Sequence, residues 1–261
     1  MSHWQKYHAR WSQIHPPLRP NEEVIERLQA IVEPSARAVL LLGVTPELAD
    51  AFGHVTAVDK NPAMIRNVWP GDTPTKRATE GDWLDLASEQ RRFAAVVGDG
   101  SLNNVAWPDE ISKLLHISMD LLEPGGVFAC RLFERPAAAI SIAQLQNTVT
   151  AKAVTNFHAF KWQIAMHLAA RRGANVPVID ILQSFNSLCP DREQLSGVTG
   201  WSHQSIDTID VYAGSNIVYS FPDRAEFEQT VPGSALDVTF HNCGNYDLAE
   251  CCPILSFRKP G

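Results

Sequence analysis

Between residues 38 and 133, short apolar runs alternate with helix-like segments, and this alternation limits the folds that the chain can form. The runs cover residues 38–42, 55–58, 93–97 and 127–133. Uninterrupted apolar runs of this length are typical of central strands buried on both faces. Strands that alternate with helices form βαβ units, so the pattern predicts a doubly wound α/β fold with a mostly parallel sheet.

The rest of the chain has a different pattern. Asn21 offers an N-cap to a helix over residues 22–31. Residues 136–214 are mostly helical in pattern, and we interpret them as an inserted cap. Residues 236–240 and 254–257 predict two closing strands, arranged as an antiparallel hairpin at the sheet edge. The predicted parts are an N-terminal segment or lid (1–35), a core (36–135 and 215–261) and a helical insertion (136–214).

Composition and charge disfavour several classes of protein. The net charge of −7, the pI of about 5.7 and the lack of a dense Lys/Arg run disfavour a nucleic-acid binder. No uninterrupted apolar run approaches the roughly 20 residues that span a bilayer. The first residues match neither a secretion signal nor a transit peptide, so we expect a cytoplasmic protein. Adjacent Cys251 and Cys252 would point to opposite faces of a strand, which argues against a shared metal.

The loops after the first two predicted strands carry residues suited to a nucleoside ligand. In an open α/β sheet, ligands bind outside the carboxyl ends of the strands. Gly43 ends the first strand and permits a tight turn and the close approach of a ligand. Asp59 ends the second strand, where a carboxylate can accept hydrogen bonds from both ribose hydroxyls. An ordinary strand-end glycine and an ordinary helix cap are the alternatives for these two residues.

Two later loops carry a similar signal. Gly81-Asp82-Trp83 combines a carboxylate that could accept from an adenine amine with a ring that could cover the base. Gly98-Asp99-Gly100 places an acidic residue between glycines at a strand end, where it could face a cationic group. Asp82 could instead cap a helix, and the second loop could be a simple turn.

With these loops, residues 39–133 resemble the cofactor half of the class I S-adenosylmethionine-dependent methyltransferases. The most specific similarity is the run Leu-Leu-Glu-Pro-Gly-Gly over residues 121–126, which is very like the family's turn from helix to strand. The resemblance implies a seven-stranded sheet with flanking helices, and S-adenosyl-L-methionine as the cofactor. It also implies a set of cofactor-binding residues: Gly43, Val44, Thr45, Asp59, Lys60, Met64, Asp82, Trp83 and Asp99.

The first loop departs from the family pattern. Thr45 and Glu47 stand where two further glycines usually lie, and Leu41 stands where an acidic residue is common. One alternative is therefore a methyltransferase-like protein that binds the cofactor without turnover. Another is a nicotinamide-dependent oxidoreductase, which Gly43 and Asp59 would suit, although the loop lacks a G-x-G-x-x-G fingerprint.

The sequence defines the methyl-acceptor side of the site less well. The net negative charge of the chain and the helical insertion together favour a small-molecule acceptor. Tyr7, Trp11 and Arg19 could fold over the cofactor and line the substrate pocket, although a core-facing helical stripe explains Tyr7 and Trp11 equally well. Residues of the insertion expected to shape the acceptor pocket are Phe157, Phe160, Lys161, Trp162 and Trp201. Candidates for a general base, none of which is assigned a catalytic role, are His8, His15, His158, His167 and His203.

Overall fold

A seven-stranded sheet in the order β3-β2-β1-β4-β5-β9-β8 forms the centre of the computed structural model, which describes residues 11, 13–33 and 38–261. The strands are β1 (Val39–Leu42), β2 (Val55–Asp59), β3 (Lys76–Glu80), β4 (Phe93–Asp99), β5 (Leu122–Arg131), β8 (Leu236–His241) and β9 (Ile254–Arg258). The first five strands are parallel, and β9 is antiparallel to both β5 and β8. The predicted doubly wound, mostly parallel sheet and its closing antiparallel hairpin are confirmed.

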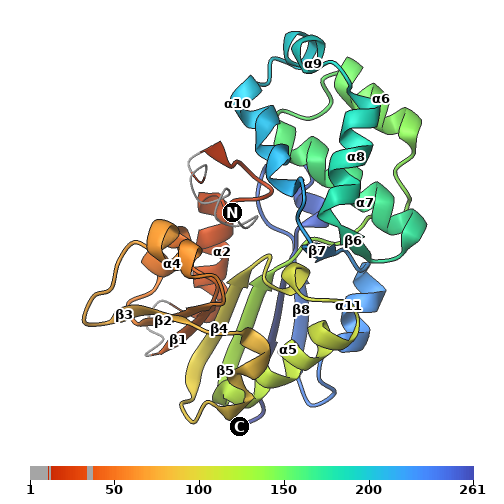
Figure 1. Ribbon diagram of the computed structural model, residues 1–261. Coiled ribbons are helices and arrows are strands. Elements are labelled where there is room, and N and C mark those ends of the chain that lie inside the picture. Colours follow the sequence, from red (N-terminus) through yellow and green to blue (C-terminus); the bar gives the residue numbers. More distant parts are fainter. Residues whose placement is uncertain (1–10, 12, 34–37) are drawn as a thin grey trace.

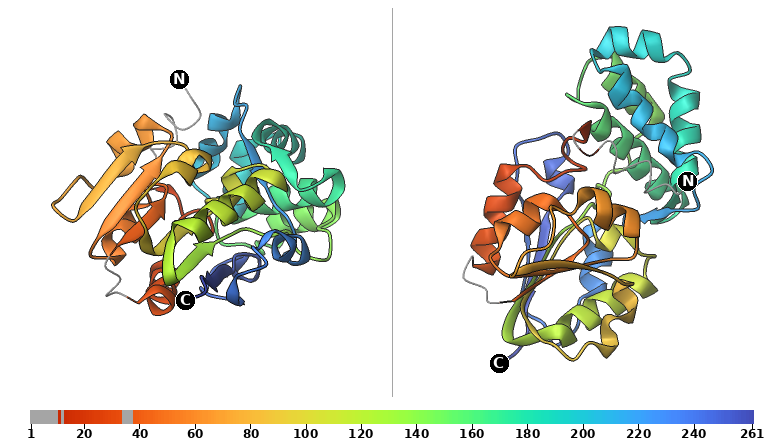
Figure 2. Two further views of the ribbon diagram at one scale, coloured as in Figure 1. Left: turned by 90° about the horizontal axis from the view of Figure 1, so that it is seen from below. Right: turned by 60° about the vertical axis from the view of Figure 1, so that its left-hand side comes forward.

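The apolar run of β1 is buried because helices cover both faces of the sheet (Figures 1 and 2). Val39 and Leu41 pack into one hydrophobic core, and Leu40 and Leu42 pack into another. Helices of the first core are α2 (Glu22–Val32), α3 (Pro46–Ala51) and α4 (Pro62–Val68), and elements of the second are α5 (Asp109–Leu121), α11 (Arg224–Thr230) and the short helix η2 (Trp83–Ser88). A strand with apolar residues on both faces needs both layers, which explains the absence of polar alternation.

Helix boundaries follow the capping residues of the sequence. The Asn21 side chain accepts a hydrogen bond from the Val24 N–H at the start of α2. Asp223 and Glu226 form a reciprocal capping box at the start of α11. The turn after α5 requires glycine twice, because Gly125 has φ +76° and a Cβ on Gly126 would lie 2.9 Å from the Glu123 carbonyl oxygen.

The sequence patterns do not predict two of the strand pairings, that of β3 with β2 and that of β6 with β7. β3 has the sequence Lys-Arg-Ala-Thr-Glu and lies at the sheet edge, so it lacks an apolar run that would identify it. Inside and after the insertion, β6 (Asn175–Pro177) pairs with β7 (Val218–Ser220) as a separate two-stranded sheet. Since β7 lies beyond residue 215 yet pairs with the insertion, the division of the chain at that residue stays a prediction.

The insertion is helical, and it supplies most of a hydrophobic core that also includes Ile14, Phe133 and Leu248. Its elements are α6 (Ile142–Thr150), α7 (Phe157–Arg172), α8 (Val178–Leu188), α9 (Arg192–Thr199), α10 (His203–Ile206) and η4 (Asp207–Tyr212). The predicted stripe of Phe157, Phe160, Ile164 and Leu168 is buried in that core. Figure 1 places the insertion beyond one end of the sheet, away from the C-terminus. Within the described ranges, no helix is long and apolar enough to span a membrane.

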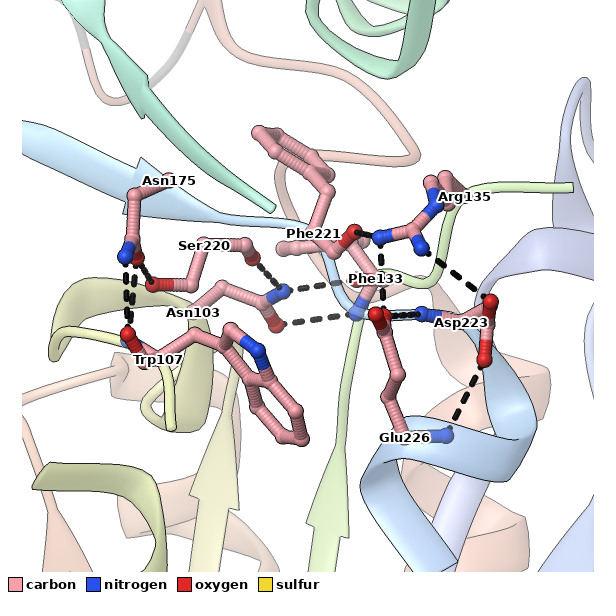
Figure 3. Close-up of polar contacts among 9 residues, drawn as sticks. All are labelled: Asn103, Trp107, Phe133, Arg135, Asn175, Ser220, Phe221, Asp223 and Glu226. Atoms are coloured by element: carbon pink, nitrogen blue, oxygen red, sulfur yellow. Dashed lines mark hydrogen bonds and ion pairs between the residues drawn. The ribbon is translucent and has the colours of Figure 1, made fainter. Parts of the chain in front are cut away.

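A network of hydrogen bonds, buried around Asn103 and exposed around Asn175, joins the insertion to the sheet (Figure 3). Asn103, in the short helix η3 (Leu102–Asn104) after β4, accepts from the Phe133 N–H at 2.9 Å. Its amide nitrogen donates to the carbonyl oxygens of Phe133 at 2.7 Å and Ser220 at 2.5 Å. The Asn175 side chain exchanges two hydrogen bonds with the backbone of Trp107. One asparagine thus connects the ends of β4, β5 and β7.

A second group of contacts supports the same junction from the other side. Arg135 donates to the Phe221 carbonyl oxygen at 3.0 Å and pairs with Asp223 at 3.1 Å and Glu226 at 2.8 Å. The segment that enters the insertion is thereby fastened to the segment that leaves it.

Replacing Asn103 by Ala is expected to lower the free energy of unfolding by about 1–3 kcal/mol, because the Phe133 N–H stays buried without an acceptor. Urea denaturation monitored by circular dichroism measures the change. Asn67→Ala is the control, because Asn67 is exposed and its side chain donates to the Ala63 carbonyl oxygen of its own helix, its one hydrogen bond to the described residues. Equal stability of both variants would contradict the role given to Asn103.

Candidate functional site

A cavity of about 340 Å³ lies at the carboxyl ends of β1, β2 and β4, between the sheet and the insertion. Its lining comes from two sides. The loops after the strands contribute Gly43, Val44, Thr45, Asp59, Lys60, Asn61, Gly81, Trp83, Asp99, Gly100 and Ser101. The insertion and β7 contribute Trp162, Asn216, Ile217, Val218 and Tyr219. The predicted location of a ligand outside the strand ends therefore coincides with a pocket that is partly open to solvent.

The loop after β1 turns at Gly43, whose φ of +108° is one that residues with a side chain rarely adopt. Its N–H donates to the Val58 carbonyl oxygen at 2.9 Å, which holds the turn against the end of β2. Val44 and Thr45 follow directly along the cavity wall, and Thr45 stands at the N-cap of α3 without a capping side-chain bond. The loop therefore brings backbone close to the cavity.

Asp59 lies at the cavity wall with acceptor capacity to spare. Its Oδ1 accepts from the Asn61 N–H at 2.8 Å, which is its one hydrogen bond within the described part of the chain. Burial raises the pKa of the Asp59 carboxyl to about 6, against the opposing effects of the Asn61 N–H and the Lys60 charge. Met64, one turn into α4, is 7% exposed and also lines the cavity. A carboxylate beside an apolar surface suits a ribose next to a base.

In the loop after β3, Asp82 caps a short helix and Trp83 lines the cavity. Asp82 accepts from the Leu84 N–H at 3.0 Å as the N-cap of η2, and its other oxygen lies 3.6 Å from the Lys60 ammonium. This side chain does not line the cavity, so its proposed contact with adenine stays a prediction. Trp83 does line the cavity, and its indole N–H donates to the Val58 carbonyl oxygen at 2.6 Å. The ring is thus held at the ends of β1 and β2.

Asp99 reaches the cavity wall, but its carboxylate is already bound. Arg131, opposite it on β5, donates from Nε to Oδ1 at 2.5 Å and from Nη2 to Oδ2 at 3.0 Å. Arg131 is fully buried between the rings of Phe133 and Tyr246, and it also donates to the Tyr246 hydroxyl at 2.9 Å. Burial opposes the charge of Arg131, but the charge and hydrogen bonds of Asp99, together with Tyr246 and Cys252, raise the pKa of Arg131 well above its ordinary value. Sequence patterns did not identify Arg131.

The N-terminal segment contributes one of its three predicted residues to the cavity. Trp11 lines it, whereas Arg19 does not, and Tyr7 lies outside the described residues. Arg19 instead pairs with Glu47 at 2.5 Å and lies 5.8 Å from the centre of the Trp11 ring. Glu47, at a position where the family that the sequence resembles usually has glycine, is therefore paired with Arg19 of the N-terminal segment.

None of the histidines in the described part of the chain lines this cavity, and the candidate His8 lies outside the described residues. His158 is buried in the insertion and bonds through Nε2 to the Gln13 carbonyl oxygen at 3.0 Å. Burial, aided by the nearby Lys161 charge, lowers the pKa of His158 to about 3, so its ring is neutral. His167 contacts the Ile140 carbonyl oxygen, and His203 lies 3.3 Å from Glu193.

Of the insertion residues expected to shape the acceptor pocket, Trp162 lines the cavity. Phe157, Phe160 and Trp201 belong to the hydrophobic core that the insertion mostly supplies, and Lys161 is fully buried in the insertion. Sequence reasoning missed several polar lining residues: Asn103, Asn104, Glu110, Asn216 and Tyr219. Asn103 and Asn104 lie three and four residues after Gly100, the last residue of the predicted loop, and this proximity was the available signal.

Comparison with known proteins gives fold similarity without sequence relatives. No protein-family model and no curated protein matches the chain. The N-methyltransferase NodS from Bradyrhizobium japonicum, solved with S-adenosyl-L-homocysteine, is 12% identical, with 98% of this chain and 100% of NodS covered and a TM-score of 0.52. DesVI from Streptomyces venezuelae is 13% identical, with 98% of this chain and 93% of DesVI covered and a TM-score of 0.49.

CalS10, an amino pentose methyltransferase from Micromonospora echinaspora, is 24% identical with a TM-score of 0.39. The match covers 45% of this chain and spans about half, 51%, of CalS10. The similarity to NodS over both full chains shows that this chain has the fold of the class I S-adenosylmethionine-dependent methyltransferases, as the sequence resemblance predicted.

Replacing Asp99 by Asn is expected to lower the free energy of unfolding by about 3–5 kcal/mol, because the buried Arg131 guanidinium loses its counter-charge. Chemical denaturation at pH 7.5 measures the loss. The matched control is Asp180→Asn, whose partner Arg172 is exposed, so a change of about 0–1 kcal/mol is expected. Similar losses in the two variants would show that the Asp99–Arg131 pair does not support the site.

Proposed function

We propose that the protein is an S-adenosylmethionine-dependent methyltransferase that acts on a small molecule. The observation that carries this proposal is the juxtaposition of Gly43 and Asp59 at one cavity wall. The positive φ of Gly43 brings backbone to the cavity, and the Asp59 carboxylate lies beside it with an oxygen that accepts no hydrogen bond from the described residues. The NodS structure, which has this fold, contains S-adenosyl-L-homocysteine, and this supports the choice of cofactor.

The lining residues offer groups suited to each part of the cofactor. The loop at Gly43, Val44 and Thr45 would hold the methionine part, and Asp59 would accept hydrogen bonds from the ribose hydroxyls. Met64 and Trp83 would lie against the adenine. Lys60, paired with Asp82, would border the nucleoside, and Asp99 would contribute to the wall through a carboxylate already held by Arg131.

The cofactor, when bound, supplies a methyl group that its positive sulfur has already activated. The protein's contribution is therefore mainly to bind and orient the reactants and to exclude water. The aromatic rings of Trp11, Phe133 and Trp162 would provide the water-excluding wall.

One observation favours a second candidate function, a cofactor-binding protein without turnover. Thr45 and Glu47 occupy positions where this family usually has glycine, and side chains there could shift the bound cofactor. Glu47 does not line the cavity and its charge is matched by Arg19, which favours retained binding. Product formation with an identified acceptor separates the two functions, because only the enzyme converts the cofactor to S-adenosyl-L-homocysteine in an acceptor-dependent way.

Replacing Asp59 by Asn is expected to weaken S-adenosyl-L-homocysteine binding by about 10–100-fold, the equivalent of about 1–3 kcal/mol, because a neutral amide accepts less strongly from the ribose hydroxyls. Since the Asp59 carboxyl has a pKa of about 6, wild-type affinity should fall as the pH drops from 8 to 5, whereas the affinity of the variant should change little. Isothermal titration calorimetry at both pH values measures these affinities.

Thermal unfolding at pH 8 provides the control for Asp59→Asn. Because burial raises the pKa of Asp59, the ionised carboxyl disfavours the folded state above pH 6, and its removal should not lower the melting temperature. A folded wild type that binds neither S-adenosylmethionine nor S-adenosyl-L-homocysteine would refute the proposed function. Equal affinity of wild type and variant would refute the role of Asp59.

A further inference from the structure

The wall of the cavity on the side of the insertion exposes apolar side chains. Trp11, Leu18 and Ile217 are half-buried, line the cavity and pack against the hydrophobic core that the insertion mostly supplies. Val218, at the start of β7, is also half-buried and lines the cavity beside Ile217. Two separate segments, one N-terminal and one leaving the insertion, thus present apolar surface to the same space. A ligand that covers such surface removes it from water and gains affinity.

Aromatic rings complete this apolar wall. Trp162 meets Phe133 edge to face, with ring centres 5.4 Å apart and an angle of 85° between the ring planes. The Trp162 ring centre also lies 5.5 Å from that of Tyr219. All three residues line the cavity and are at most 5% exposed, so packing against their neighbours sets their positions. They form a boundary behind the half-buried side chains.

The polar side chains that follow β4 along the cavity are already bonded within the protein. The Asn103 amide makes three hydrogen bonds to backbone atoms of Phe133 and Ser220. The Ser101 hydroxyl donates to the Leu42 carbonyl oxygen at 2.7 Å. Asn103 and Ser101 are at most 2% exposed, so they offer a ligand very little polar surface.

Two further polar residues at this wall are engaged as well. The Asn104 amide nitrogen donates to the Gly100 carbonyl oxygen at 2.8 Å, and the Asn104 side-chain oxygen is buried. Burial raises the pKa of the Tyr219 hydroxyl, and a side-chain hydrogen bond with Tyr212 opposes this rise. The Tyr219 hydroxyl is therefore protonated at neutral pH and already bonded. A ligand against this wall meets few donors or acceptors that are free to bind it.

Polar groups with spare hydrogen-bonding capacity lie at the mouth of the cavity instead. Glu110 and Asn216 are exposed lining residues. Glu110 accepts from the Ala106 N–H through Oε2 at 2.7 Å, which leaves Oε1 available, and the Asn216 amide bonds to no other described residue. Polar atoms of a ligand can therefore be satisfied at the mouth, whereas hydroxyls placed against the apolar wall would lose their bonds to water without replacement.

We propose, on the basis of the methyltransferase function above, that the methyl acceptor is a small, largely apolar molecule with few hydroxyl groups, and not a sugar or another polyol. Its apolar body contacts Leu18, Ile217 and Val218. A polyol would have to give up several hydrogen bonds to water at a wall that replaces few of them. Leu18 and Ile217 thereby act as specificity-determining residues.

The test measures binding with protein saturated with S-adenosyl-L-homocysteine at pH 8. The apolar probes are benzyl alcohol and cyclohexylmethanol, and the polyol probes are myo-inositol and methyl glucoside. All four are uncharged and contain one six-membered ring, so they differ chiefly in the number of hydroxyl groups. Calorimetric titration is expected to show that each apolar alcohol binds about tenfold or more tightly than each polyol.

Matched variants connect this preference to the wall. Ile217→Asn and Leu18→Gln should each reduce the preference for the apolar probes at least about fivefold, while affinity for S-adenosyl-L-homocysteine stays within about twofold. Ile142→Asn and Leu236→Gln make the same substitutions at residues that are 48% and 50% exposed and do not line the cavity, so they should change neither quantity. Because Leu18 and Ile217 belong to separate segments, one variant remains informative if the other fails to fold.

Four results would overturn the proposal. A polyol could bind as tightly as the apolar probes, or no apolar probe could bind at millimolar concentration to protein that binds S-adenosyl-L-homocysteine. The preference could survive in both wall variants, or fall equally in the two control variants. Failure of S-adenosyl-L-homocysteine itself to bind to folded protein would instead refute the proposed function, so the two failures are distinguishable.

Discussion

Burial of the sheet on both faces is the constraint on which the rest of this structure depends. Because β1, β4 and β5 are apolar on both sides, helices must cover both faces, and no face remains for a ligand. Polar chemistry is therefore concentrated in the loops at the carboxyl ends of the strands. The insertion closes the space above those loops, and the cavity lies where the sheet, the insertion and the N-terminal segment meet.

Much of the fold could be predicted from the sequence because the signals are local. Apolar runs identify β1, β2, β4 and β5, and capping residues identify the start of α2 and α11. Edge strand β3 could not be predicted, because its polar side chains carry no periodic apolar signal. The β6–β7 pair depends on contacts between residues more than forty positions apart, which no local pattern encodes.

The site shows the same division between local and distant information. Gly43, Asp59 and Trp83 lie at the end of a strand or within three residues of one, and all line the cavity. Arg131 was missed because its role depends on its position opposite Asp99 in the register of β4 and β5. Asp82 and Arg19 were expected to face ligands, but their charged groups bond within the protein, to Leu84 N–H and Glu47. A sequence pattern identifies a suitable residue type without showing which partner that residue has.

The contact between Arg19 and Glu47 also bears on how this chain can change over generations. A glutamate beside the loop after β1 is tolerated here because an arginine from the N-terminal segment matches its charge. Replacement of Glu47 by glycine, the usual residue at this position in the family that the sequence resembles, would leave Arg19 against Trp11 without its anion. Oε2 of Glu47 is already buried without a partner among the described residues, so loss of Arg19 alone would also remove the partner of Oε1. The two positions are therefore epistatic, and the loop and the N-terminal segment are expected to vary together among descendants of this sequence.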